Sequence, residues 1–368
     1  MKDKDKRKEK LWILMFFLML CGSQICWLFA DQEAVAGHEN RTAAKKPVFS
    51  IAAIEEYPAM YEAYYNDRLP WRDELIRLNS ALSYYVFRSS SNQNVIRGRA
   101  GWLFYNSYTD DNPVEGYKGM RLFTEAELAQ IADNLVTTQA LLAEQGTEFV
   151  LFIAPNKERI YAEKMPAFYG APAQIYRTGQ LVEYLRENTD IRVVYPYEEL
   201  LAAKETYPWQ LYYRLDTHWN YIGAYIGSRA LAAELGIEMP ALEELTITET
   251  EPTICDLADM LNLRESLNTD SDYVLSGYDS YQLTTDRHDL TGAYIYHCQG
   301  GDARKLFMLR DSFADAMDDF VASRFQASCM VHYSSYSHQL ALQEEADIFV
   351  YETVERRVGE LLNFRMEL

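Results

Sequence analysis

Along residues 98–368, short apolar runs alternate with longer stretches in which apolar positions recur at helical spacing. Short runs flanked by turn residues are typical of buried strands, and an apolar residue at every third or fourth position is typical of amphipathic helices. Such alternation predicts a parallel β-sheet with helices on both faces. The predicted strands lie at residues 148–155, 191–196 and 305–309 and within the closing segment 346–358, and the predicted helices at residues 125–146, 178–187, from about 220 and at 313–325.

Two regions depart from this alternation. Residues 51–87 are amphipathic, with Pro70 marking a break between two helical pieces, so residues 31–97 are interpreted as a linker and a membrane-proximal helical arm. Residues from about 238 to 300 carry turn residues and short alternating runs, which predict a β-rich insertion. Residues 98–368 are therefore expected to form the main domain, with the insertion inside it.

The N-terminus predicts a membrane anchor. Residues 2–10 hold six lysines and arginines, and residues 11–30 carry no charge. An apolar stretch of about twenty residues can cross the hydrocarbon core, and its basic flank remains in the cytoplasm. We therefore expect a basic cytoplasmic tail at 1–10, a transmembrane signal anchor at 11–30 and an extracytoplasmic remainder. A cleaved signal peptide, with residues 34–36 as its processing site, is the alternative.

The charge of the chain excludes one class of partner. Acidic residues outnumber basic ones by 55 to 35, which gives a formal net charge of −20. A nucleic-acid-binding protein needs the opposite sign, so no nucleic acid is expected as a partner. A polyanionic substrate would need a local basic groove that overrides this field.

Cysteine usage leaves two interpretations open. Only Cys255, Cys298 and Cys329 follow the apolar segment, and they form no CxxC pair or cysteine–histidine cluster. A structural metal site is therefore not expected. One disulfide with a free thiol and three reduced thiols both fit this count.

Ser312 is the first candidate for chemistry. The apolar run that ends at Leu309 is followed by Arg310, Asp311 and Ser312, where a helical pattern begins. Ligands of open parallel sheets gather at the carboxyl ends of the strands, and free N–H groups at a helix start favour negative charge. Ser312 is thus a candidate nucleophile. A helix N-cap is the alternative, and Asp311 is a candidate only for shaping the turn.

Asp216 and His218 are the candidate partners of that serine. In an extended stretch, residues two apart point to the same side, so the carboxylate can hold one imidazole nitrogen and leave the other free for a proton. A satisfied surface pair and half of a metal site are the alternatives. The metal interpretation lacks ligands at suitable spacing, because the other histidines are scattered at positions 38, 288, 297, 332 and 338.

Several stretches resemble one known family. The segment DTHWNYIGA at 216–224 is similar to the signature of SGNH-hydrolase-like proteins that O-acetylate exported polysaccharides, the alginate O-acetyltransferase group, and of the related DHHW proteins. Six further stretches fit the resemblance in a consistent order: YNDRLPWRDELI at 65–76, GRAGWLFY at 98–105, APNKERIYAEKMP at 154–166, DLADMLNL at 256–263, LRDSF at 309–313 and VYETVER at 350–356.

The resemblance implies a flavodoxin-like, three-layer α/β/α SGNH domain with a parallel sheet. Carried over position by position, it makes Ser312 the nucleophile, His218 the general base and Asp216 the residue that orients the base. DHHW proteins carry a second histidine where this chain has Thr217, so the acetyltransferase form of the motif is the closer match. Cys255 stands where a glycine is more usual.

Five further residues are candidates for binding. Asn156 or Lys157, just past the strand at 148–155, could donate to an oxyanion beside the Ser312 N–H, although a plain turn is the alternative there. Three aromatic residues are candidates for stacking on sugars, with a core position as the alternative. These aromatic residues are Trp102, Tyr105 and Tyr161.

The resemblance therefore implies a membrane-anchored, extracytoplasmic serine O-acetyltransferase that modifies a cell-envelope or secreted polysaccharide through an acyl-enzyme. Its expected partners are a polysaccharide acceptor and a membrane-bound O-acyltransferase that supplies the acyl group, with no cofactor. An SGNH-type carbohydrate esterase and a catalytically idle glycan-binding scaffold are the alternatives.

Overall fold

The computed structural model describes residues 10–18, 21–22, 44–69, 71–252, 254–267, 270–278, 283–287 and 293–367. The chain forms two compact units, Met1–Val86 and Phe87–Leu368. The division falls before β1 (Val95–Arg97), which pairs with β2 (Leu103–Tyr105) inside the second unit. The boundary predicted from the sequence lies after Arg97 instead.

The first unit contains the helical pieces of the arm. These are η2 (Ile51–Ala53), α2 (Tyr57–Asn66), α3 (Arg72–Ala81) and the π-helical turn η3 (Leu82–Val86). Residues 10–18 are also helical, but among the described residues no helix is both long enough and apolar enough to cross a bilayer. Residues 19–20 and 23–43, which include most of the second half of the predicted anchor and the candidate processing site, lie outside the described part.

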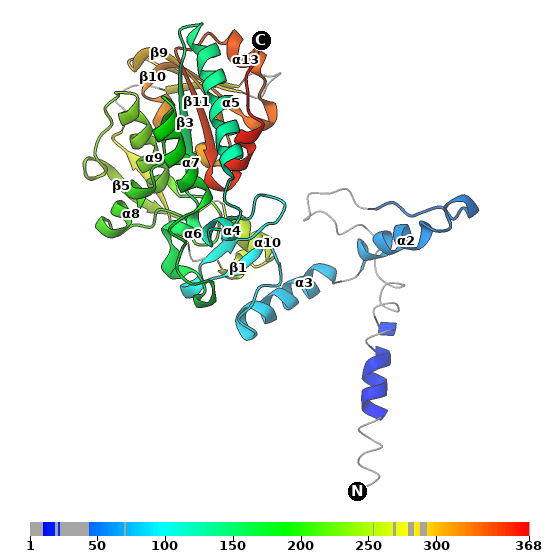
Figure 1. Cartoon of the computed structure of the whole chain (residues 1–368). Coiled ribbons are helices and arrows are strands. Elements are labelled where there is room, and N and C mark those ends of the chain that lie inside the picture. The colour runs from blue at the N-terminus through cyan, green and yellow to red at the C-terminus, as the bar shows by residue number, and fades with distance from the viewer. Residues whose placement is uncertain are drawn as a thin grey trace. The chain divides into compact units, whose positions relative to one another are not determined.

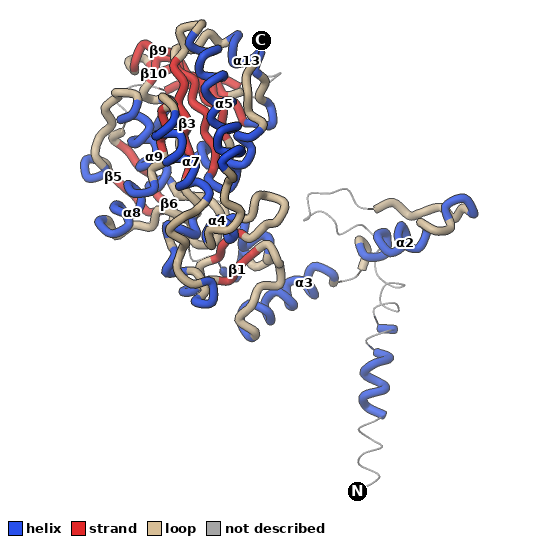
Figure 2. Tube along the Cα trace, in the orientation of Figure 1, coloured by secondary structure: helices blue, strands red, loops and turns tan. Residues whose placement is uncertain are grey.

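A seven-stranded sheet forms the centre of the second unit (Figures 1 and 2). Its order is β4-β3-β11-β9-β10-β8-β7, and the first five strands pair in parallel. Because β8 pairs antiparallel with both β10 and β7, the sheet is mixed, and the prediction of a parallel sheet is wrong at this edge. The strands are β3 (Glu148–Ala154), β4 (Arg192–Val194), β7 (Leu283–Arg287), β8 (Tyr294–Cys298), β9 (Asp302–Arg310), β10 (Phe325–His332) and β11 (Ile348–Val354).

Alternate residues of the central strands face two separate layers of helices. In β3, Val150 and Phe152 pack into one core, and Leu151 and Ile153 pack into the other. The first core is covered by α8 (Tyr197–Thr206), α9 (Tyr221–Glu234) and α12 (Asp318–Ala322). The second is covered by α5 (Glu125–Ala143), α7 (Arg177–Asn188), α13 (His338–Gln343) and η10 (Glu355–Leu362), of which α5 and α7 are in front of the sheet in Figure 1. This period-two pattern makes the predicted three-layer α/β/α domain.

The predicted β-rich insertion supplies two different kinds of strand. β5 (Thr246–Thr250) and β6 (Asp272–Ser276) form a separate antiparallel pair, whereas β7 and β8 extend the central sheet. Two short helices also lie in it, α10 (Asp256–Met260) and α11 (Arg264–Leu267). The remaining short helices are η4 (Arg99–Gly101), α4 (Pro113–Tyr117), α6 (Lys157–Ile160), η5 (Ala162–Lys164), η6 (Ala167–Tyr169), η7 (Leu242–Glu244), η8 (Ser312–Ala316) and η9 (Tyr333–Ser335).

The cysteines of the second unit are reduced. Cys255, Cys298 and Cys329 are buried thiols, and no disulfide joins any of the three.

Candidate active site

Ser312 lies at the carboxyl end of β9, in the turn that begins η8. Asp311, not Ser312, is the N-cap of that helix: its carboxylate accepts hydrogen bonds from the N–H groups of Phe313 and Val354, each at 2.8 Å. The N-cap alternative for Ser312 is therefore wrong. The bond from Val354 ties the turn after β9 to the end of β11, and the bond from Phe313 caps η8, so the half-buried Ser312 hydroxyl has no capping role.

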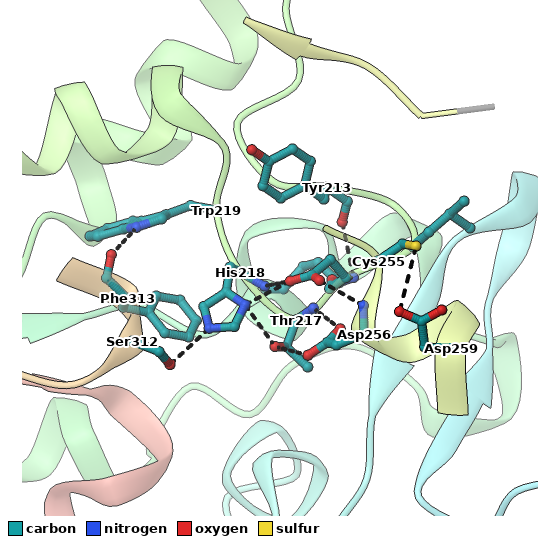
Figure 3. Close-up of polar contacts among 12 residues, drawn as sticks. Tyr213, Thr217, His218, Trp219, Cys255, Asp256, Asp259, Ser312 and Phe313 are labelled. Atoms are coloured by element: carbon teal, nitrogen blue, oxygen red, sulfur yellow. Dashed lines mark hydrogen bonds and ion pairs between the residues drawn. The ribbon is translucent and has the colours of Figure 1, made fainter. Parts of the chain in front are cut away.

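Ser312, His218 and Asp216 form a continuous hydrogen-bonded chain. Figure 3 shows the contact between Ser312 and His218. Ser312 Oγ is 2.9 Å from His218 Nε2, and His218 Nδ1 is 2.6 Å from Asp216 Oδ1. Ninety-four residues separate the serine from the histidine. This is the geometry of a nucleophile, a base and a carboxylate that holds the base in one tautomer.

The Asp216–His218 segment is a turn, not the extended stretch that the sequence predicts. Asp216 Oδ1 accepts a hydrogen bond from the His218 backbone N–H at 3.0 Å as well as from the imidazole. An aspartate that bonds the N–H two residues later closes a local turn. One oxygen therefore fixes both the backbone and the ring of the histidine.

Two residues outside the predicted site, Thr217 and Asp256, hold this turn in place. The Asp256 N–H donates to Asp216 Oδ2 at 2.7 Å, and the Asp256 carboxylate accepts from the Thr217 N–H and hydroxyl at 2.8 and 2.6 Å. Thr217 Oγ1 is also 3.2 Å from His218 Nδ1. Asp256 opens the DLADMLNL stretch, but only the fold brings it to residues forty positions earlier.

The local charges favour an ionised Asp216 beside a basic histidine. Burial alone would raise the pKa of Asp216, but the hydrogen bond and charge of His218 and the N–H of Asp256 outweigh burial and lower that pKa to about 2. Burial would lower the pKa of His218, but the carboxylate of Asp216 raises it above its usual value. Burial and the charge of Asp216 together raise the pKa of Asp256 to about 6.

Three contacts fix the position of the segment that carries His218. The buried Lys157 ammonium donates to the carbonyl groups of Tyr213 and Asp216, at 3.1 and 2.6 Å. Trp219 Nε1 donates to the Phe313 carbonyl at 2.7 Å, which ties the histidine segment directly to the serine turn. A side chain at Gly223 would meet the Leu211 carbonyl at 2.2 Å, so the close packing of α9 on this segment requires glycine.

The structure does not bring the predicted oxyanion and sugar-stacking residues to the serine. Lys157 is 2% exposed, and its ammonium donates hydrogen bonds to backbone carbonyls and not toward the serine. Asn156 is also buried, and its N–H donates to Glu355. Both residues follow β3, which is separated from β9 by β11. The two candidates therefore lie at the expected carboxyl-end edge of the sheet, but two strands away from Ser312.

The three aromatic candidates have core positions or lie outside the serine cavity. Trp102 and Tyr161 are buried and stack on each other with ring centroids 4.1 Å apart. The Tyr161 hydroxyl accepts a hydrogen bond from the Leu211 N–H, which also ties it to the core. Tyr105 is half-buried and lies near the Arg356 guanidinium.

The cavity at the serine has a volume of about 380 Å³. It is lined by the three residues of the hydrogen-bonded chain together with Tyr213, Trp219, Tyr221, Ile254, Cys255, Asp256, Asp259, Arg264, Phe313, Asp315 and Ala316. A cavity of this size holds a small acyl group with part of a larger acceptor.

Two aspartates and the histidine of this site have the spacing of a metal site. Asp216, His218 and Asp256 each place one ligand atom within 4.8 Å of the others. Their donor atoms are already engaged in hydrogen bonds with one another, with Thr217 and with Ser312. Because a metal ion would have to break these bonds, the arrangement fits serine chemistry better than metal binding.

Comparison with known proteins supports the resemblance drawn from the sequence. Residues 95–289, just over half of the chain, match the family model described as "SGNH hydrolase-like domain, acetyltransferase AlgX". The matched range includes Asp216 and His218 and ends before Ser312. The probable alginate O-acetylase AlgJ of Pseudomonas syringae is 29% identical over 220 residues, which are 55% of this chain and 50% of that protein. AlgJ of Pseudomonas aeruginosa is 26% identical over 202 residues, 52% of this chain and 47% of that protein, so the chain spans about half the length of these relatives.

Two solved structures share the fold. A DHHW family protein from Eubacterium siraeum superposes with a TM-score of 0.51 at 15% identity, covering 74% of this chain and 99% of that one. Bacillus cereus PatB1 with a sulfonyl adduct superposes with a TM-score of 0.53, also at 15% identity, covering 74% of this chain and 97% of that one. At this identity the likeness concerns the fold alone.

Proposed function

Because the chain belongs to the SGNH hydrolase-like family of the acetyltransferase AlgX, we propose that it is a serine-dependent O-acetyltransferase that modifies a polysaccharide. The hydrogen-bonded chain from Ser312 through His218 to Asp216 is the observation that carries this proposal. The relatives that match part of the chain are named as alginate O-acetylases, which supports acetyl transfer over other serine chemistry.

The reaction has two steps in this proposal. Ser312 Oγ attacks the carbonyl carbon of an acetyl donor while His218 Nε2 accepts the hydroxyl proton, and the leaving group departs with that proton. A sugar hydroxyl then loses its proton to His218 and attacks the acetyl-serine, and Ser312 recovers the proton as the sugar ester leaves. Asp216 stabilises the imidazolium in both steps, and the Ser312 N–H is our candidate for the first oxyanion donor.

A glycan acceptor separates acetyl transfer from simple hydrolysis. We expect the acetyl-enzyme formed from p-nitrophenyl acetate to pass its acetyl group to an added oligosaccharide, because the cavity excludes part of the bulk water and offers room for a sugar. Mass spectrometry of the oligosaccharide detects the product. Free acetate as the sole product, at every acceptor concentration and with every oligosaccharide, would favour the carbohydrate esterase. Absence of labelling by a fluorophosphonate would favour the idle scaffold.

The anchor at residues 11–30 and an extracytoplasmic catalytic domain belong to this proposal. The uncharged segment that follows a basic tail supports them. An acyl group used on the extracytoplasmic side of the membrane must be carried across it. A membrane-bound O-acyltransferase is the class of partner that we propose for this step.

An uncleaved anchor predicts that the protein stays with the membrane fraction after a high-salt wash, because salt removes charge-held proteins and leaves inserted helices. N-terminal sequencing of the mature protein provides the check. A mature chain that begins near Asp31 or Gly37 would identify a cleaved signal peptide instead.

A further inference from the structure

A second, larger cavity adjoins the one that contains Ser312. Its volume is about 550 Å³, and it shares Tyr221, Asp315 and Ala316 with the serine cavity. The remaining lining comes from β6 and the bend after it, β8, α12 and the end of β9: Tyr273, Val274, Leu275, Tyr278, Tyr294, Tyr296, Arg310, Asp318, Asp319 and Phe320. A ligand held here can therefore extend directly to the serine.

Tyrosine dominates the lining of this second cavity. Five of its thirteen residues are tyrosines, and Tyr221, at the start of α9, is 41% exposed. Tyr278 and Tyr294 are half-buried, so part of each ring faces the cavity. Tyrosine rings combine an apolar face with a hydroxyl, which suits the alternating C–H faces and hydroxyl groups of a sugar.

The charge of the cavity is acidic. Among the described residues, three aspartates and one arginine line it. Arg310 is buried and ion-paired with Asp315 and, at 3.2 Å, with Asp318, so its charge is already balanced. Burial raises the pKa of Asp318 to about 7, and the exposed Asp319 adds a further carboxylate to the lining.

Among the described residues, four aspartates and one arginine line the serine cavity. Its arginine, Arg264, pairs with Asp259 at 2.9 Å. Asp216 adds a further negative charge beside the serine. A carboxylate-bearing sugar in these cavities would meet an excess of like charge, and like charges placed together weaken binding.

From this lining we propose that the tyrosine-lined cavity is the acceptor subsite, and that it takes a glycan without carboxylates, built of uncharged or amine-bearing sugars. The inference rests on the proposed function, since the subsite presents a sugar hydroxyl to the acetyl-serine. It also separates this chain from relatives named for alginate, whose sugars are uronic acids.

Titrating the Ser312→Ala variant of the whole chain with three hexasaccharides of matched length tests the subsite. One is built of uncharged hexoses, one of glucosamine and one of mannuronate. We expect the better of the first two to bind at least about ten-fold more tightly than the mannuronate oligomer in isothermal titration calorimetry. This variant needs no catalysis, so the binding result is independent of whether Ser312 is the nucleophile.

Two further substitutions in that background locate the binding. Tyr221→Ala should weaken the preferred oligosaccharide by about ten-fold, whereas Tyr108→Ala, a change at an exposed tyrosine outside both cavities, should leave its affinity unchanged. Asp319→Lys should reduce the difference in affinity between the preferred oligosaccharide and the mannuronate oligomer. Thermal unfolding confirms that each variant is folded.

Mannuronate binding as tight as that of the other oligomers would overturn the proposal. So would the absence of measurable binding by all three, or equal effects of Tyr221→Ala and Tyr108→Ala.

Discussion

Ser312→Ala is expected to abolish acetyl transfer and to leave the protein folded. The substitution removes the oxygen that attacks the donor, and loss of a serine nucleophile typically lowers turnover by about a million-fold. Asp311 caps η8, so the alanine variant loses the hydrogen bond to His218 but no cap, at a cost of about 1 kcal/mol or less. The thermal transition should therefore be nearly that of the wild type.

Intact-mass spectrometry after a brief incubation with p-nitrophenyl acetate measures the acetyl-enzyme directly. The wild type should gain one acetyl group, Ser312→Ala none, and His218→Ala far less than the wild type. An acetyl group on another serine, or ester turnover by the alanine variant, would contradict the assignment of Ser312 as the nucleophile.

Asp216→Asn is expected to slow turnover by about a thousand- to ten-thousand-fold, as loss of the orienting aspartate generally does. Asp216 Oδ1 receives two hydrogen bonds from His218, and Oδ2 receives the Asp256 N–H. An asparagine has only one carbonyl oxygen, so its amide must either face the Asp256 N–H or donate to His218 Nδ1. If the amide donates to His218 Nδ1, it holds the histidine in the wrong tautomer. If the amide faces the Asp256 N–H, two hydrogen-bond donors oppose each other.

The same substitution should move the pH dependence of the reaction. The neutral imidazole is the base, so a pKa raised by Asp216 means that the wild-type rate increases with pH and levels off above the usual histidine pKa. Without the carboxylate the imidazolium loses its stabilising charge, and the inflection should move to lower pH. A pH profile of kcat/KM measures both effects.

Asp190→Asn, at an exposed aspartate that lines neither cavity, provides the matched control. It should keep the rate and the inflection of the wild type. Near-full activity of Asp216→Asn, with an unchanged inflection, would mean that Asp216 only supports the local backbone.

The sequence by itself predicted the layered fold and pointed to Ser312, His218 and Asp216 as the candidate site residues. Period-two and helical spacings depend on local backbone geometry, so β3, α5 and α7 could be predicted close to their observed bounds. The family resemblance pointed to the three candidate residues, because the motifs of a family keep their residue types and their order along the chain.

Contacts between distant segments had to come from the tertiary structure. Asn156 and Lys157 end a strand at the expected edge of the sheet, but the strand order puts β11 between them and Ser312. Asp256 supports the Asp216 turn across forty residues, and no local pattern encodes that contact.

The tyrosine-lined cavity likewise draws on β6, β8, α9 and α12, which are adjacent only after folding. Residue types and local periods are properties of the sequence. Strand order, burial and the grouping of charges depend on long-range packing, and only the tertiary structure decided them.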